Sequence, residues 1–258
     1  PHSPIHTVEL PGGERGQIVM APACQKGTLS MTFRKPSLLR FTHKDYVNSG
    51  RYDRAQAIAS PILTLKAWQR DMQEAHAAGD WDRFMEIAVA HRQNIIVFGG
   101  PGSGKTTYGK SLIDLFPAHR RMVTIQEMLE DPLPFHPNHV HLFYGHVVGP
   151  KALVASSLRM KPDHLFLTEL TGDEVWHFIE ILNTGTEGTV TTAHANDSEA
   201  GYARVCGLVK QSEVGKGLDY AYIERLVRTS FDVVVYMEKQ DILEVHYEPE
   251  YKLALLNG

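Results

Sequence analysis

A glycine-rich segment near the middle of the chain has the residue types and the spacing that bind phosphate. Residues 99–106 read Gly-Gly-Pro-Gly-Ser-Gly-Lys-Thr and match the pattern G-x-x-x-x-G-K-[ST]. In such a loop, backbone N–H groups turn inward around the β-phosphate, Lys105 reaches the β- and γ-phosphates, and the Thr106 hydroxyl ligates Mg²⁺. The sequence therefore predicts a nucleoside triphosphate site with Thr106 as the metal ligand. The residues expected to bind the nucleotide are Gly100, Pro101, Gly102, Ser103, Gly104, Lys105, Thr106 and Thr107.

The residues on either side of this loop form the elements that must position it. Ile95 to Phe98 make a short apolar run typical of a buried strand, and Tyr108, Leu112 and Phe116 recur at helical spacing after the loop. A strand, a loop and a helix in this order place phosphate at the amino end of the helix. A chance glycine-rich turn would need neither element.

Two further segments place carboxylates directly after predicted strands. Residues 164–169 form an apolar strand that ends in Glu169, where a carboxylate can orient and activate water. The alternative is a solvated glutamate at a strand end. Residues 122–131 place Glu127 and Glu130 after another strand, as ligands of metal-bound water or as the base. A merely solvated acidic loop is the alternative there.

A histidine follows a further predicted strand. Residues 189–196 are rich in β-branched residues and carry His194 to the carboxyl end of that strand. There its imidazole could donate a hydrogen bond to the γ-phosphate or to Glu169, and so sense an intact triphosphate. A histidine with a purely structural role is the alternative.

The composition is that of a soluble globular protein with one large or two smaller domains. The 258 residues are 43% hydrophobic and 22% charged, without an apolar run long enough to span a membrane. The formal net charge of −4 argues against a broad footprint for nucleic acid, so no direct sequence-specific binding of nucleic acid is expected. The first residues lack a signal-peptide pattern and an initiator Met, which indicates a cytoplasmic chain that begins inside a longer protein or at a processed end. Cys24 and Cys206 form no C-x-x-C pair and are expected to be reduced core thiols.

The pattern changes twice along the chain. Residues 1–50 hold short β-like runs that bury too little to stand alone, so we expect the C-terminal part of a small α+β domain, which docks on the rest or is completed by upstream residues. Residues 51–93 read as a polar linker and two helical stretches, with Asp80 as an N-cap between them. In residues 94–258 β-like and helical runs alternate, which predicts an α/β domain with a mostly parallel sheet and phosphate at the carboxyl ends of its strands.

In order and spacing, these segments resemble the four nucleotide-site boxes of the secretion ATPase superfamily. The boxes are the P-loop at 99–107, the aspartate box with Glu127 and Glu130, the Walker B strand that ends in Glu169, and the histidine box at 192–196. Segments 27–37, 137–144 and 157–163 look like the traffic ATPases of type IV secretion and conjugation systems. The resemblance spans nearly the whole chain.

This resemblance implies a RecA-like P-loop domain that clasps ATP and Mg²⁺ against an N-terminal domain. It further implies an ATP-hydrolysing homo-hexamer, peripheral at the cytoplasmic face of the inner membrane, that works with other subunits of a secretion machine. By the same resemblance, Arg34 reaches the nucleotide from the N-terminal domain and Arg159 acts near phosphate, where a guanidinium can neutralise developing charge. For either residue, a surface arginine is the alternative. Two other functions stay open: a pilus-type or type II secretion ATPase, and a non-catalytic ATP-gated scaffold.

The chain departs from the family pattern at three positions. Gln126 stands where the aspartate box usually has an acid, Thr171 where arginine is common, and Thr186 where histidine is frequent. Hydrolysis is therefore expected to be slower or differently tuned.

Four histidines lie close together in the sequence. A zinc site needs three or four ligands in tetrahedral reach, but no cysteine or carboxylate joins them at ligand spacing. We interpret the group as a histidine-rich surface hairpin in which the second and third members share one face of a strand. The four are His136, His139, His141 and His146.

Overall fold

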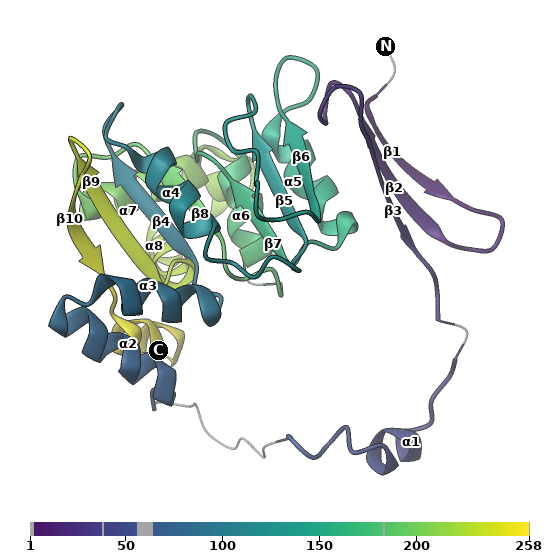
Figure 1. Cartoon of the computed structure of the whole chain (residues 1–258), viewed down its shortest axis with the longest axis horizontal. Coiled ribbons are helices and arrows are strands. Elements are labelled where there is room, and N and C mark those ends of the chain that lie inside the picture. The colour runs from purple at the N-terminus through teal and green to yellow at the C-terminus, as the bar shows by residue number, and fades with distance from the viewer. Residues whose placement is uncertain (1–2, 38, 56–63, 183, 258) are drawn as a thin grey trace.

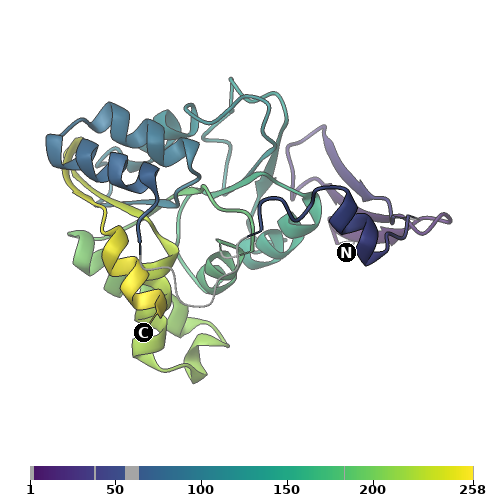
Figure 2. The ribbon, with the colours of Figure 1, turned by 90° about the horizontal axis from the view of Figure 1, so that it is seen from below.

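A small N-terminal sheet and a larger α/β body make up the protein, which is shown as a computed structural model in Figure 1. The structure describes residues 3–37, 39–55, 64–182 and 184–257. In two perpendicular views the N-terminal sheet lies on one side of the α/β body, and helix α9 with the C-terminus lies on the other (Figure 1, Figure 2). In the described part of the chain, none of the helices has the length and apolar character needed to cross a membrane.

The N-terminal sheet is antiparallel, with strand order β1-β2-β3. Its strands are β1 (Ile5–Glu9), β2 (Arg15–Met20) and β3 (Leu29–Arg34). One face of the sheet docks on the α/β body, because Gln17 Nε2 donates to Ser156 Oγ at 2.9 Å and Cys24 forms a β-bridge with Leu142. Of the two arrangements expected for this part of the chain, the structure therefore shows docking on the rest.

In the described residues between the N-terminal sheet and the P-loop strand there are three helices. They are α1 (His43–Asn48), α2 (Ala67–Ala78) and α3 (Trp81–Ala90). Thr42 and Asp45 form a capping box at the start of α1, which lies in the connecting segment (Figure 1). Asp80 caps α3 by accepting from the Arg83 N–H, which confirms the predicted N-cap. The predicted polar linker spans residues 51–61, and its residues 56–61 lie outside the described part of the chain.

The α/β body contains two groups of strands, ordered β10-β9-β4-β8 and β6-β5-β7. All neighbours within these groups are parallel except β10, which is antiparallel to β9. The strands are β4 (Ile95–Gly99), β5 (Met122–Gln126), β6 (His139–Phe143), β7 (His164–Leu167), β8 (Val190–Ala193), β9 (Val233–Glu238) and β10 (Asp241–His246). The helices are α4 (Lys105–Ile113), α5 (Pro150–Ser157), η1 (Leu158–Met160), α6 (Glu174–Leu182), α7 (Ser198–Gln211), η2 (Gly215–Gly217), α8 (Tyr220–Ser230) and α9 (Pro249–Asn257).

Helices cover both faces of this sheet, which explains why β4 is apolar throughout. Ile95 and Val97 point into a core shared with α2, α3 and α4, while Ile96 and Phe98 point into a core shared with α5 to α8. A parallel strand buried on both faces reads as a continuous apolar run, because alternation is lost when neither face meets water.

Side chains rather than a regular backbone ladder join β7 to β8. Three β8-side threonine hydroxyls donate to carbonyls of the β7 segment: Thr189 to Leu165 at 2.6 Å, Thr191 to Leu167 at 2.6 Å, and Thr192 to Thr168 at 2.9 Å. These bonds make β8 the neighbour of β7, so the two groups of strands form one layer (Figure 1).

The predicted α/β fold with a mostly parallel sheet is confirmed. The apolar run 95–98 forms β4, and the strand predicted for 164–169 is β7, which ends at Leu167. The surface hairpin of histidines is wrong, because β6 pairs in parallel with β5 and both His136 and His141 are buried. The rings of His139 and His141 are 4.5 Å apart, as expected for two residues on one face of a strand. Among the described residues, no group of three or more His, Cys, Asp or Glu is arranged to hold a metal ion.

The two cysteines are free thiols, and both are buried. Burial is also the main cause that raises the pKa of Cys206 to about 11. The prediction of reduced core thiols is therefore confirmed.

Candidate nucleotide site

The P-loop turns between the carboxyl end of β4 and the amino end of α4. Gly104 is the N-cap of α4 and has a φ of +91°, a conformation that costs glycine little and other residues more. At Gly99 a Cβ atom would lie 2.4 Å from the Met237 carbonyl oxygen of β9. The loop thus needs glycine at Gly104 for its backbone conformation and at Gly99 for its close approach to the neighbouring strand.

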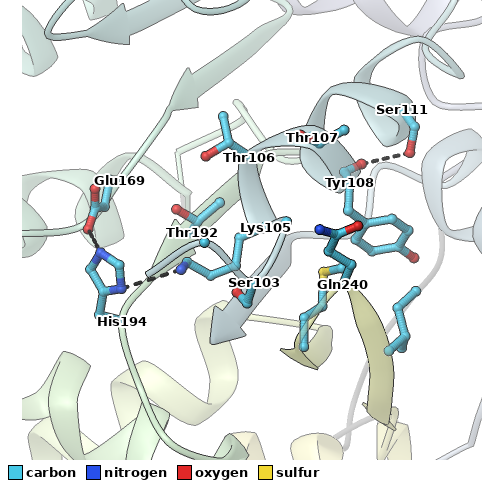
Figure 3. Close-up of a pocket in the computed structure, with 14 residues that line it drawn as sticks. Ser103, Lys105, Thr106, Thr107, Tyr108, Ser111, Glu169, Thr192, His194 and Gln240 are labelled. Atoms are coloured by element: carbon cyan, nitrogen blue, oxygen red, sulfur yellow. Dashed lines mark hydrogen bonds and ion pairs between the residues drawn. The ribbon is translucent and has the colours of Figure 1, made fainter. Parts of the chain in front are cut away.

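A cavity of about 780 Å³ opens above this loop (Figure 3). One wall is the P-loop and the first turns of α4, and the other walls come from the ends of three strands and the β9–β10 turn. The lining residues are Gly102, Ser103, Gly104, Lys105, Thr106, Thr107, Tyr108, Ser111, Glu169, Thr192, His194, Met237, Gln240 and Ile242. A cavity of this size, lined by a helix amino terminus, suits a nucleotide.

Lys105 is held inside the loop by backbone acceptors. Its Nζ donates to the carbonyl oxygens of Gly99 and Gly100, each at 2.8 Å, and lies 3.3 Å from Nδ1 of His194. Burial lowers the pKa of Lys105, and the carboxylate of Glu169 acts in the opposite direction. The lysine is therefore already oriented towards the place where phosphate oxygens would replace the carbonyls.

His194 connects Lys105 to Glu169. Its Nε2 lies 2.9 Å from Oε1 of Glu169, while its Nδ1 faces both the Lys105 ammonium and the Gly99 carbonyl oxygen at 3.3 Å (Figure 3). The side chain of Glu169 keeps about 34% of its surface exposed, so one carboxylate can contact both His194 and a water in the cavity. The ends of three strands thus bring together a cation, an imidazole and a carboxylate.

The acidic loop after β5 lies at the border of this constellation. Glu130 is exposed and lines a small cavity beneath α4 that also touches Thr106. Glu127 is exposed as well, and its charge adds to the effect of burial in raising the pKa of Tyr144 to about 12. Neither carboxylate is among the described residues that line the main cavity.

The unusual Gln126 has a structural role. It is buried, its Nε2 donates to Thr124 Oγ1 at 2.9 Å, and its Oε1 accepts the Glu130 N–H at 3.0 Å. Gln126 therefore holds the loop that carries Glu130. Thr171 lies three residues before the start of α6, and its N–H donates to Glu174 Oε1 at 2.9 Å.

The structure does not bring the two arginines named from the sequence to the main cavity. Arg34 is exposed at the end of β3. Arg159 lies in η1 and lines a separate cavity between the N-terminal sheet and α5. Within the described chain, Lys105, Glu169 and His194 meet, whereas Arg34 and Arg159 lie elsewhere.

Several residues of the cavity wall were not identified from the sequence. Tyr108 is the clearest, since burial raises the pKa of its phenol to about 12 although it lines the cavity. Its position three residues after Lys105, on the same side of α4, is a signal that could have found it. Gln240 sits in the turn before β10 with a φ of +74°, and β10 was not predicted.

The sequence of this chain is similar to known secretion proteins. The family model described as "Type II/IV secretion system protein" matches residues 62–248. The type IV secretion system protein VirB11 of Brucella suis biovar 1 (strain 1330) is 38% identical, over 98% of this chain and 73% of the relative. The VirB11 of Bartonella henselae is 35% identical, over 99% of this chain and 77% of the relative.

Solved structures give the same answer. The crystal structure of the VirB11 ATPase from the Brucella suis type IV secretion system, in complex with sulphate, superposes with a TM-score of 0.91 at 39% identity, covering 97% of this chain and 78% of that one. The Legionella pneumophila ATPase DotB, at 15% identity and a TM-score of 0.52, shares the fold. The type IV secretion interpretation is thus confirmed over the pilus-type, type II and scaffold alternatives. The chain belongs to the VirB11 family of type IV secretion system ATPases.

Proposed function

We propose that this ATPase hydrolyses ATP in the cavity above the P-loop, with Glu169 as the group that activates the attacking water. The contact between Lys105, His194 and Glu169 carries the proposal, because it places a cation for the phosphates and a carboxylate for water in one cavity. His194 holds one oxygen of Glu169 at 2.9 Å and leaves the other oxygen for the proton of that water.

Lys105 has a defined part in this scheme. Its ammonium is bound by two carbonyl oxygens of the loop, so an arriving β,γ-phosphate exchanges neutral acceptors for charged ones. The same exchange changes the contact of Lys105 with His194, and through His194 the contact with Glu169. An intact triphosphate would in this way be communicated to the carboxylate.

The donor set of the cavity fits Mg²⁺. This ion prefers oxygen ligands and takes few from the protein, and the cavity offers the Thr106 hydroxyl at the phosphate end with the Glu169 carboxylate opposite. Thr106 would hold the ion together with phosphate oxygens and water. When bound, Mg²⁺ would neutralise charge on the β- and γ-phosphates.

Four further residues named from the sequence lie outside the main cavity, and we expect them to act in the assembled protein. We propose a hexameric ring, peripheral at the cytoplasmic face of the inner membrane, in which Arg34 reaches a nucleotide from outside its own P-loop. Its exposed position at the end of β3 supports this role. Arg159, Glu127 and Glu130 would approach phosphate or the water around the metal only when neighbouring parts close on the cavity.

Substitution of the carboxylate tests the catalytic proposal. Glu169→Gln keeps the shape and the contact with His194, so ATP should still bind, while steady-state phosphate release should fall about 10²- to 10⁴-fold because the base is lost. Glu86→Gln, on the exposed side of α3, is the matched control and should release phosphate at the wild-type rate. Equal rates in the wild type and in Glu169→Gln would refute the role of Glu169.

Light scattering tests the ring. The mass of the protein, measured with and without a non-hydrolysable ATP analogue, should reach six chains when the analogue is bound. A protein that stays monomeric at every concentration, with analogue present, would contradict the hexamer.

A further inference from the structure

Thr192 makes a hydrogen bond on each side of Glu169. Its Oγ1 donates to the Thr168 carbonyl oxygen at 2.9 Å, and its own carbonyl oxygen accepts the Leu170 N–H at 2.8 Å. One residue of β8 therefore holds both peptide groups that flank the glutamate. Thr192 is only 5% exposed, although it also lines the nucleotide cavity with Glu169 and Lys105 (Figure 3).

The same residue is tied to the strand that leads into the P-loop. In the parallel ladder between β4 and β8, Thr192 pairs with Val97, two residues before Gly99. Val97 and Thr192 are buried in the sheet, so their relative position is set by packing as well as by the ladder. Thr192 thus links the glutamate segment on one side to the P-loop strand on the other.

This link matters because β7 ends before Glu169. The strand stops at Leu167, and the backbone of Thr168 to Leu170 lies beyond its ladder with β5. On the β5 side, Thr168 makes two hydrogen bonds to the Ile125 carbonyl oxygen. Its N–H donates at 3.1 Å and its hydroxyl donates at 3.4 Å. On the β8 side the Thr192 hydroxyl replaces a ladder bond.

We propose that Thr192 is a positioning residue that sets the place of the Glu169 carboxylate relative to the P-loop. The inference rests on the proposed role of Glu169 as the base. Without the hydroxyl, the Thr168 carbonyl loses its donor, and on the β8 side the glutamate segment keeps only the bond from the Leu170 N–H to the Thr192 carbonyl oxygen. Because catalysis depends on where the base stands, the turnover number should fall about ten- to a hundredfold while ATP still binds.

Three single variants test this proposal in the full chain. Thr192→Val keeps the shape and removes the hydroxyl, and Thr192→Ser keeps the hydroxyl. Thr191→Val is the matched control, because the Thr191 hydroxyl makes the same kind of bond, to Leu167 at 2.6 Å, but does not flank the glutamate. Each protein is measured for kcat by phosphate release, for Kd of a non-hydrolysable ATP analogue, and for thermal stability.

The expected pattern separates positioning from simple stability. Both valine variants should lose similar stability, but only Thr192→Val should lose turnover, with Kd within about twofold of the wild type. Thr192→Ser should restore at least half of the wild-type kcat. If Thr192→Val does not fold, Thr192→Ala, which avoids a methyl group facing the carbonyl, takes its place.

The activity of a double variant distinguishes a positioning role of Thr192 from a general structural role. Thr192→Val added to Glu169→Gln should cost no further activity, because a positioning residue has nothing left to position. A further loss in the double variant, or an equal loss of kcat in Thr191→Val, would overturn the role of Thr192. If Glu169→Gln keeps full activity, the proposed role of Glu169 as the base is refuted. If Glu169→Gln is inactive but Thr192→Val is fully active, the role of Glu169 stands and the positioning role of Thr192 is refuted.

Discussion

Two buried histidines should make the protein lose stability when the pH falls below neutral. Burial lowers the pKa of His141 and of His164 to about 4 in the folded protein. In the unfolded chain an imidazole has a pKa of about 6.5, so the unfolded state binds more protons between these values. The stability that the two neutral histidines contribute is therefore fully present above about pH 6.5 and is lost as the pH falls towards 4.

The size of the effect follows from the two pKa values. Between pH 7.5 and 5.5, each histidine should lower the free energy of unfolding by on the order of 1 kcal/mol, and the pair by roughly 2 to 3 kcal/mol. Burial explains why neither ring gains a proton easily, and it outweighs the Gly188 carbonyl oxygen beside His164, which raises the pKa of that ring. Nδ1 of His164 lies 2.9 Å from the Gly188 carbonyl oxygen, and Nδ1 of His141 lies 2.8 Å from Thr124 Oγ1. Both rings thus use a neutral partner, and both are at least 96% buried.

Urea denaturation of the full chain at the two pH values checks this prediction. In His164→Gln, the difference between pH 7.5 and 5.5 should shrink by on the order of 1 kcal/mol, whatever the absolute stability of the variant, because the contribution of this titrating group is gone. His119→Gln, on an exposed residue, is the control and should leave the difference unchanged. An unchanged pH difference in His164→Gln would refute the reasoning.

Two further predictions concern side chains that hold the sheet. Asn94→Ala should cost about 2–4 kcal/mol of unfolding free energy, because the buried carboxamide donates to the Ser230 carbonyl oxygen at 2.8 Å and accepts the Gly188 N–H at 2.9 Å. Chemical denaturation measures this loss. A loss below about 0.5 kcal/mol would contradict the prediction. Gly201→Ala should cost about 1–3 kcal/mol, because its Cβ would lie 2.4 Å from the Phe98 ring. Gly207→Ala in the same helix meets nothing within 4 Å and is the control, and equal melting temperatures for the two variants would show that the Phe98 contact is not limiting.

The parts of the site that could be predicted from the sequence follow one simple rule. In a parallel sheet the carboxyl ends of the strands meet at one edge, so polar residues directly after apolar runs converge there. This rule placed Lys105, Glu169 and His194 together, and the structure agrees. It also named Glu127 and Glu130, which do not line the main cavity; Gln126 accepts the Glu130 N–H and so anchors their loop.

The rest depended on contacts that a linear pattern does not encode. The hydroxyl of Thr192 matters only because β8 lies beside β7, and the order of strands in space is not their order in the chain. The histidines were interpreted as a surface hairpin because no cysteine or carboxylate joins them at metal-ligand spacing. The structure instead offers acceptors inside the protein, for example the Phe116 carbonyl oxygen 2.9 Å from His136 Nε2. Polar side chains can be buried in a core when they have hydrogen-bond partners there.

The buried contact between Gln126 and His141 has a consequence for how these two positions can vary in evolution. Gln126 Nε2 lies 3.3 Å from His141 Nδ1, and the uncharged amide suits a neutral imidazole. A glutamate at position 126 would bury a negative charge that needs a cation beside it, so position 141 would then have to supply one. Among related chains an acid at 126 should therefore accompany a basic residue at 141, that is a lysine, an arginine or a histidine that can take up a proton. An alignment in which the two vary independently would contradict this coupling.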